Sequence, residues 1–341
     1  MVLWQLAATF KTMQILPSIE LAGIIKHYLF LDSKKVDGKN LRLFSDGNTG
    51  LVLTTKKDLS LVVNNNNGFE NLPNSFLYGQ ITQFKDILLL NDISLIIVVF
   101  QPTGIKKLLQ IPANDLRNYI VATKDILGNR APEIEEQLAT ATATHERVNL
   151  LNTFFISLLY KSNHEKEQVI SASINFILKN KGLTTVNDLV KFTGYTERHL
   201  ERKFMEYVGI SPKSFSSIIK LHHFLQVLRS KTADNNLTRI AYDAGYADQS
   251  HLIKEFKKYT GITPGSYINK ANKLAVNLVA LPNAVELSTG ISEALVNTAL
   301  GILTSTVAII MYNFYTNRID SITYGIDEAG YTIVQNFAAK N

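Results

Sequence analysis

The stretch GYADQSHLIKEFKKYTGITPGSY at residues 245–267 decides the fold, because a second copy, GYTERHLERKFMEYVGISPKSF, occurs at residues 194–215. Seven residues of the first copy recur at a constant offset of 52 positions. They are Leu200, Phe204, Tyr207, Gly209, Ile210, Pro212 and Ser214, which reappear as Leu252, Phe256, Tyr259, Gly261, Ile262, Pro264 and Ser266. Such a repeat indicates one supersecondary unit that is used twice.

Each copy follows a short predicted helix that ends in a glycine turn. Thr185 is placed to cap the first of these helices, which continues through Leu189 and ends near Gly194. In the second, LTRIAYDAGY puts its apolar residues on one face and ends near Gly245. A helix, a tight glycine turn and a second helix make up the helix-turn-helix arrangement.

The second helix of each unit has a buried stripe and a polar face. Leu200 and Phe204, like Leu252 and Phe256, lie four residues apart and predict the buried stripe. On the polar face, Arg and Lys can pair with guanine, Gln with adenine and Glu with cytosine. The candidate DNA-contacting residues are Arg198, His199, Glu201, Arg202, Gln249, Ser250, His251 and Lys254. For His199, a core or capping role is the alternative.

A predicted continuous helix joins the two units. Residues 211–230, SPKSFSSIIKLHHFLQVLRS, predict a rod of about 18 residues, roughly 27 Å long. Such a rod could hold two recognition helices about one DNA turn, roughly 34 Å, apart. Residues 165–273 contain 17 Lys and Arg against 10 Asp and Glu, whereas the rest of the chain has 18 against 19. A local basic surplus attracts phosphates, although a solvated helical face would give the same count.

With A-G-Y, D-Q-S-H-L, F-K-K and G-I-T-P in the second copy, residues 165–273 resemble the DNA-binding domain of the AraC/XylS transcription-regulator family. The resemblance implies an all-α domain with two helix-turn-helix units that bind asymmetric double-stranded promoter or operator DNA. It also implies that the protein recruits or blocks RNA polymerase. Carried over by residue, the contacts fall at Arg198, Glu201, Arg202, Ser250, His251 and Lys254. Glu201 departs from the family pattern, which more often has a neutral or basic side chain there.

Residues 13–160 are predicted to form a sensor or dimerisation domain, which makes the fold class α+β. Short β-rich runs over residues 24–101, separated by turn formers such as Asp46-Gly47-Asn48, indicate a β-barrel or sandwich. Residues 103–160 have a helical period, and their last apolar group is either a buried helix or a homodimer seam. The stretch QPTGIKKLLQIP at 101–112 resembles the sensor domains that precede many AraC-type heads.

A small-molecule effector of this sensor would lie inside the barrel. Its candidate aromatic residues are Tyr28, Phe30, Phe44, Tyr78 and Phe84, for which plain core packing is the alternative.

The sequence argues against an enzymatic function. The chain has no cysteine, and His27 is the only histidine before His145, so thiolate sites and histidine clusters are missing. Neither a nucleophile elbow nor a P-loop or dinucleotide motif occurs in a strand-to-helix context. We therefore expect no catalytic residues, no metal and no cofactor. The N-terminus lacks the positive region of a secretory signal, which favours a cytoplasmic protein.

The tail at residues 274–341 has a different composition. Residues 294–317 are 24 uncharged residues, enough for about 36 Å of helix against a hydrocarbon core of roughly 30 Å. GISEALVNTALGI at 290–302 resembles the last transmembrane helix of the MotA/TolQ/ExbB proton-channel family, which places a hydrophobic helix at about 291–316.

Three interpretations of the tail stay open: a fused gene segment without function, a tether to the inner membrane, and a soluble accessory helix. The alternative function, a membrane-associated protein related to these channels, rests on this tail alone.

Overall fold

The computed structural model describes most of the chain up to residue 281. The described residues are 10–34, 39–56, 61–65, 68–160, 168–230, 237–269, 272–273 and 278–281, with residues 311, 316 and 330 singly. The described residues up to 281 belong to one compact unit. The predicted hydrophobic helix at about 291–316 therefore lies outside the described residues, apart from Met311 and Thr316. Within the described part of the chain, no helix combines the length and apolar character needed to cross a bilayer.

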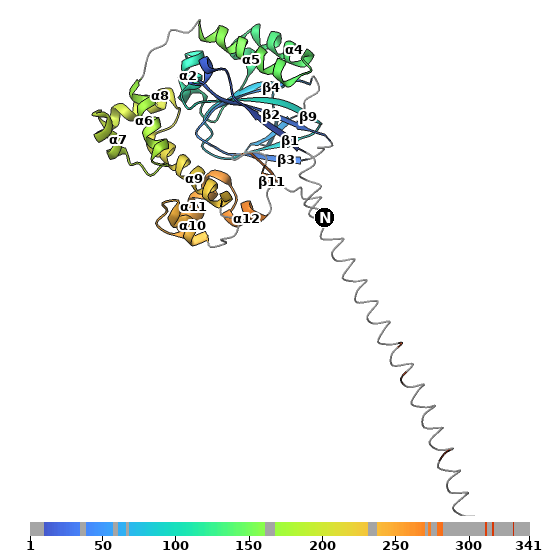
Figure 1. Ribbon diagram of the computed structural model, residues 1–341, viewed down its shortest axis with the longest axis vertical. Coiled ribbons are helices and arrows are strands. Elements are labelled where there is room, and N and C mark those ends of the chain that lie inside the picture. The colour runs from blue at the N-terminus through green and yellow to red at the C-terminus, as the bar shows by residue number, and fades with distance from the viewer. Residues whose placement is uncertain are drawn as a thin grey trace, which may run out of the picture. The chain divides into compact units, whose positions relative to one another are not determined.

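The N-terminal region is built from two six-stranded antiparallel sheets (Figure 1), which confirms the predicted β-rich domain. The first sheet has the order β1-β2-β9-β4-β7-β10. Its strands are β1 Phe10–Ile15, β2 Ile25–Ser33, β4 Gly50–Thr54, β7 Phe76–Tyr78, β9 Ile93–Phe100 and β10 Ile120–Ala122. The second sheet has the order β11-β12-β3-β8-β5-β6. Its strands are β3 Lys39–Leu43, β5 Leu61–Asn65, β6 Gly68–Asn71, β8 Lys85–Leu89, β11 Asn272–Lys273 and β12 Leu278–Leu281.

Strand β9 shows why the first sheet needs cover on both faces. Successive side chains of a strand point to opposite faces. Accordingly, Ile96 and Val98 join a buried cluster with the helices, whereas Ile93 and Leu95 join a cluster shared with the second sheet. A continuous apolar run such as ISLIIVVF is therefore typical of a strand buried on both sides.

Helices cover the outer face of the first sheet. They are η1 Ile19–Leu21, α2 Gly104–Leu109, η2 Ala113–Leu116, α3 Thr123–Leu127, α4 Arg130–Thr140 and α5 Thr144–Leu159. Leu151 and Phe155 of α5 are fully buried, and the Phe155 ring meets Phe100 edge-on with 6.0 Å between centroids. The helical period expected at Ile120 is wrong, because β10 pairs there with β7 and matches Ile120 to Tyr78.

Among the described residues, seven helices form the region that follows the sheets, here called the head (residues 168–269). They are α6 Gln168–Lys179, α7 Val186–Thr193, α8 Glu197–Tyr207, α9 Pro212–Ser230, α10 Leu237–Asp243, α11 Gln249–Thr260 and α12 Pro264–Asn269. One buried cluster runs through all seven, from Ile170 on α6 to Tyr267 on α12. The predicted rod at residues 211–230 is confirmed as α9, which has 19 residues.

The chain returns to the N-terminal region after the head. Strand β12 pairs with β3, so that Leu278 lies opposite Leu43 and Leu281 opposite Asn40. The resemblance implies an all-α domain over residues 165–273, and strand β11 at their end corrects this expectation. Two residues become a strand there because β12 supplies the hydrogen-bonding partner, which no local pattern reveals.

Candidate nucleic-acid interface

The first helix-turn-helix unit consists of α7, the turn at Gly194 and α8. A reciprocal capping box starts α7: Thr185 Oγ1 accepts from the Asp188 amide at 3.2 Å, and an Asp188 carboxylate oxygen accepts from the Thr185 amide at 2.9 Å. The Thr185 hydroxyl also donates to the Asp188 carboxylate at 2.7 Å, and this bond, followed by the one from the Thr185 amide, lowers the pKa of Asp188. Gly194 ends the helix at a φ of 72°, where its amide donates to the Val190 carbonyl. The predicted cap and turn are confirmed.

Helix α8 has the two faces expected from the sequence. Thr196 caps it by accepting from the His199 amide at 3.3 Å. Its buried face consists of Leu200, Phe204 and Tyr207. On the other face Arg198, Glu201 and Arg202 are exposed.

His199 stands apart from these three residues. It is half-buried, and its ring stacks on Tyr195 with 4.5 Å between centroids. The His199 amide donates to the capping residue Thr196, whereas the His199 ring stacks on Tyr195. The side chain itself therefore neither fills the core nor caps the helix.

The second unit repeats the arrangement with α10, the turn at Gly245 and α11. Gly245 has a φ of 81°, and its amide donates to the Tyr242 carbonyl. Asp248 caps α11 by accepting from the His251 amide at 2.7 Å. The buried residues of α11 are Leu252, Phe256, Tyr259 and Thr260.

The candidate residues of α11 differ in how accessible they are. Ser250, His251 and Lys254 are exposed. Gln249 is half-buried, and its Oε1 accepts from Thr238 Oγ1 at 2.9 Å. The His251 ring meets Tyr246 edge-on, with 5.7 Å between centroids. Gln249 is thus engaged within the unit, whereas the other three side chains face solvent.

Helix α9 holds the two units together (Figure 1). Its 19 residues give a length of about 28 Å at 1.5 Å per residue. Lys220 of α9 lies 4.2 Å from the centroid of the Tyr246 ring and 3.5 Å from a carboxylate oxygen of Glu255 on α11. A cation held by a ring and a carboxylate has little rotational freedom. The contact therefore anchors the second recognition helix to the rod.

Sequence reasoning missed two exposed aromatic residues beside the turns. Tyr195 follows the first glycine and is 40% exposed, and Tyr242 precedes the second and is 59% exposed. Tyrosine hydroxyls are common partners of DNA phosphates. The sequence does contain a signal for both residues, because a tyrosine lies within three positions of each turn glycine.

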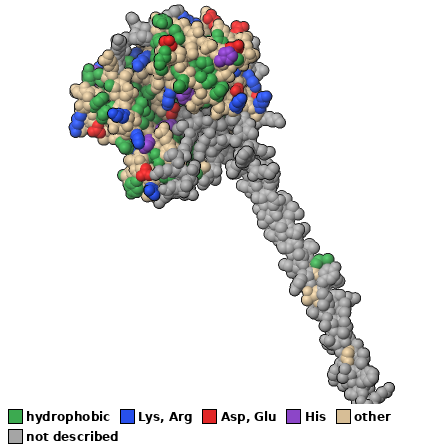
Figure 2. Space-filling model, in the orientation of Figure 1, with side chains coloured by type: hydrophobic (Ala, Val, Ile, Leu, Met, Phe, Trp, Pro, Cys, Tyr) green, Lys and Arg blue, Asp and Glu red, His purple; other side chains and the backbone are tan. Residues whose placement is uncertain are grey.

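On the face shown in Figure 2, Lys and Arg side chains are spread among polar and acidic ones. Each recognition helix nevertheless carries exposed cations, Arg198 and Arg202 on α8 and Lys254, Lys257 and Lys258 on α11.

The five aromatic residues proposed to line a barrel cavity do not share one. Tyr28 and Phe30 are packed in the cluster under the helices, and Tyr28 Oη donates to Asn152 at 2.9 Å. Phe44 and Phe84 pack against the core of the head. Tyr78 and Phe84 each line a cavity, but the two cavities are different ones. Among the described residues, no group of three His, Cys, Asp or Glu side chains could hold a metal ion.

Comparisons with known proteins match the chain in three parts. A family model described as a helix-turn-helix domain matches residues 189–270. A family described as a domain of unknown function matches residues 13–122, and the MotA/TolQ/ExbB proton channel family matches residues 274–328.

The chain is similar to two curated proteins described as HTH-type transcriptional regulators. An uncharacterized HTH-type transcriptional regulator of Haemophilus influenzae is 25% identical over 127 residues, 33% of this chain and 42% of that protein. YbfI, an uncharacterized HTH-type transcriptional regulator of Bacillus subtilis, is 34% identical over 68 residues, 20% of this chain and 24% of that protein. This chain therefore spans less than half the length of either.

A solved structure, apo ToxT from Vibrio cholerae, aligns at a TM-score of 0.42 and 16% identity over 71% of this chain and 96% of that one. The helix-turn-helix match over residues 189–270 coincides with α7 to α12, the two capped units and their connecting rod. Residues 189–270 of this chain are a helix-turn-helix domain.

Proposed function

We propose that this protein is a transcription regulator that binds specific double-stranded promoter or operator sites through its two helix-turn-helix units. The observation that carries the proposal is the repeated geometry: two capped recognition helices, each with an exposed polar face, are built on one core and one rod. A helix-turn-helix places its second helix in the major groove. With α9 between them, α8 and α11 would enter successive major grooves.

The proposed base and phosphate contacts fall on the exposed residues of both helices. They are Arg198, Glu201 and Arg202 on α8 and Ser250, His251 and Lys254 on α11. His199 and Gln249 act differently in this proposal, since their side chains are engaged with Tyr195 and Thr238. They would orient the neighbouring residues, with at most a phosphate contact of their own.

The remaining partners follow from this role. A regulator of this kind acts where the DNA lies, which places it in the cytoplasm, and it works by recruiting or blocking RNA polymerase. Its two-sheet region serves as a sensor for a small-molecule effector or as a homodimerisation surface.

Selection of bound fragments from a random DNA library tests the central proposal. The wild-type protein is expected to enrich one asymmetric motif with two half-sites separated by about one helical turn. A variant carrying Arg202→Ala and Lys254→Ala serves as the matched control and should enrich that motif far less. Recovery of fragments without a shared motif by the wild-type protein would contradict sequence-specific binding.

A further inference from the structure

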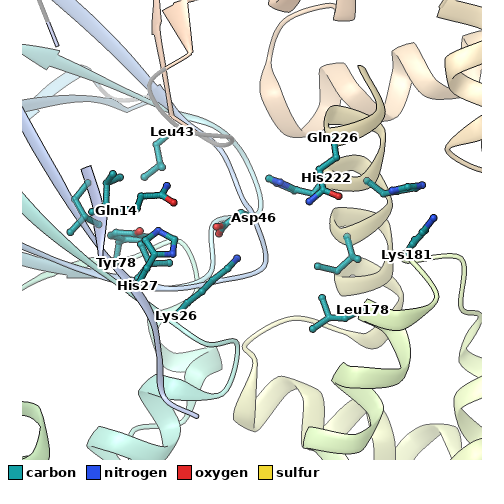
Figure 3. A pocket seen from close by; sticks show the side chains of 15 residues that line it. Gln14, Lys26, His27, Leu43, Asp46, Tyr78, Leu178, Lys181, His222 and Gln226 are labelled. Atoms are coloured by element: carbon teal, nitrogen blue, oxygen red, sulfur yellow. The ribbon is translucent and has the colours of Figure 1, made fainter. Parts of the chain in front are cut away.

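A cavity of about 630 Å³ lies where the sheets meet the head (Figure 3). Lys26, His27 and Asp46 line it from the sheet side, and Leu178, Lys181 and His222 line it from α6, the turn after α6 and α9. The volume falls within the range of small-molecule sites in proteins, about 300–1,000 Å³. Figure 3 shows the Lys26 side chain extending from the sheet towards the head, with Asp46 beside it.

The cavity has more positive than negative groups. Neither Lys26 nor Lys181 forms an ion pair among the described residues. The carboxylate of Asp46 accepts from the Asn48 amide at 3.0 Å and from Asn48 Nδ2 at 2.8 Å. Two lysines thus line the cavity with a single carboxylate, a formal surplus of positive charge that favours an anionic occupant.

Two histidines that line the cavity, His27 and His223, have lowered pKa values. Burial, and then the charge of Lys26, lower the pKa of His27, while Asp46 acts in the opposite direction. Burial, and then the charge of Lys181, lower the pKa of His223 on α9, which also lines the cavity. Both histidines are therefore kept neutral more readily than usual, and the two lysines supply the positive charge.

Both lysines occupy irregular positions of the backbone. Lys181 has a φ of 55°, a left-handed conformation that residues other than glycine rarely adopt. The pairing of β2 with β9 shifts register between Ile25 and His27, at Lys26. Bulges re-aim side chains, and strained backbone is concentrated at ligand sites. The two irregularities place both cations at the same cavity.

The cavity also offers apolar surface. Leu178 at the end of α6 remains 44% exposed, although it lines the cavity together with Leu43, Ile97 and Ile219. An anion alone, such as a free phosphate, would leave these side chains in contact with water. An occupant with an apolar body would cover them.

We propose that this cavity binds a small organic anion with an apolar body, whose charged group is held by Lys26 and Lys181 and whose body packs against Leu178. The inference extends the proposed function, because the ligand would touch α9, the rod that joins the two helix-turn-helix units. A ligand bound there would bias the separation of the recognition helices.

Two fluorescent probes with related apolar bodies test the site. Anilinonaphthalene sulfonate carries one negative charge, and N-phenylnaphthylamine carries none. In titrations of the full chain, Lys26→Gln and Lys181→Gln should each weaken sulfonate binding by at least about fivefold and leave binding of the neutral probe unchanged. Leu178→Ala should weaken binding of both probes. The matched control is Lys124→Gln, which removes an exposed lysine of α3 that does not line the cavity.

The outcomes separate this inference from the proposed function. The anion site would be refuted by Lys26→Gln and Lys181→Gln variants that bind the sulfonate as tightly as Lys124→Gln does. Equal affinity of the wild-type protein for the charged and the neutral probe would refute it as well. DNA binding without any ligand is measured on the same variants, and it should match that of the wild-type protein. A wild-type protein that binds DNA but shows no anion site would refute only the inference, whereas absence of DNA binding in the wild-type protein would refute the proposed function.

Discussion

Arg42 of β3 donates a hydrogen bond from Nη1 to the carbonyl oxygen of Thr260, the last residue of α11, at 3.3 Å. The same guanidinium binds both carboxylate oxygens of Asp86 at 2.6 Å and lies 4.1 Å from the centroid of the Phe84 ring. Phe84 in turn lies directly against Gly261, the turn glycine after α11. A cation at the C-terminal end of a helix is favoured by the helix dipole. The sheet region thus holds the end of the second recognition helix.

Arg42→Ala is expected to lower the free energy of unfolding by about 2–3 kcal/mol, because it leaves the mostly buried Asp86 without its partner. Chemical denaturation measures the loss. The double variant with Asp86→Ala should cost less than the sum of the two single variants, since no unpaired charge is left. Arg117→Ala, at an exposed arginine, is the control and should change stability by less than about 0.5 kcal/mol. Additive effects of Arg42→Ala and Asp86→Ala would show that the pair is not coupled.

Arg202→Ala and Lys254→Ala are each expected to weaken binding to the selected DNA site by about 1–3 kcal/mol, because each removes an exposed cation from a recognition helix. Gel shifts at a stated salt concentration measure the effect. If Lys254 contacts a phosphate, its variant should also show a salt dependence shallower by about one unit of slope. Lys124→Ala is the control. Unchanged affinity in both recognition-helix variants would refute the proposed contacts.

Glu201→Gln is expected to raise affinity for random-sequence DNA, because it removes a negative charge from an exposed position between Arg198 and Arg202. If Glu201 also accepts a hydrogen bond from a cytosine, the variant should lose discrimination at one base pair of the selected motif. Fluorescence anisotropy with random and specific duplexes distinguishes the two effects. An unchanged affinity for random DNA would place Glu201 away from the phosphates.

Gly245→Ala is expected to destabilise the protein by about 1–2 kcal/mol, because Gly245 adopts a φ of 81° and an added Cβ would lie 2.2 Å from a methyl carbon of Leu183. The matched control is Gly265→Ala in α12, where nothing lies within 4 Å of an added Cβ and φ is not positive. Alanine should stabilise that helix by a few tenths of a kcal/mol up to about 1 kcal/mol. Equal midpoints of thermal unfolding for both variants would contradict the turn assignment.

Local features of the sequence were enough to predict the head. The cap at Thr185, the turns at Gly194 and Gly245, and the rod at 211–230 all follow from residues within a few positions of each other. Helix hydrogen bonds and caps join neighbours along the chain, so their signals are local. The exposed faces of α8 and α11 followed as well, because a period of 3.6 residues separates the buried side from the polar one.

The sequence by itself therefore determined two helix-turn-helix units, their buried stripes and the polar residues opposite them. Only the tertiary structure decided that Phe44 and Phe84 pack against the head, that β12 pairs with β3, and that Lys26 and Lys181 line one cavity. The reason is physical: apolar side chains and strand edges gain stability from any suitable partner, and that partner is chosen by packing between residues far apart in the chain.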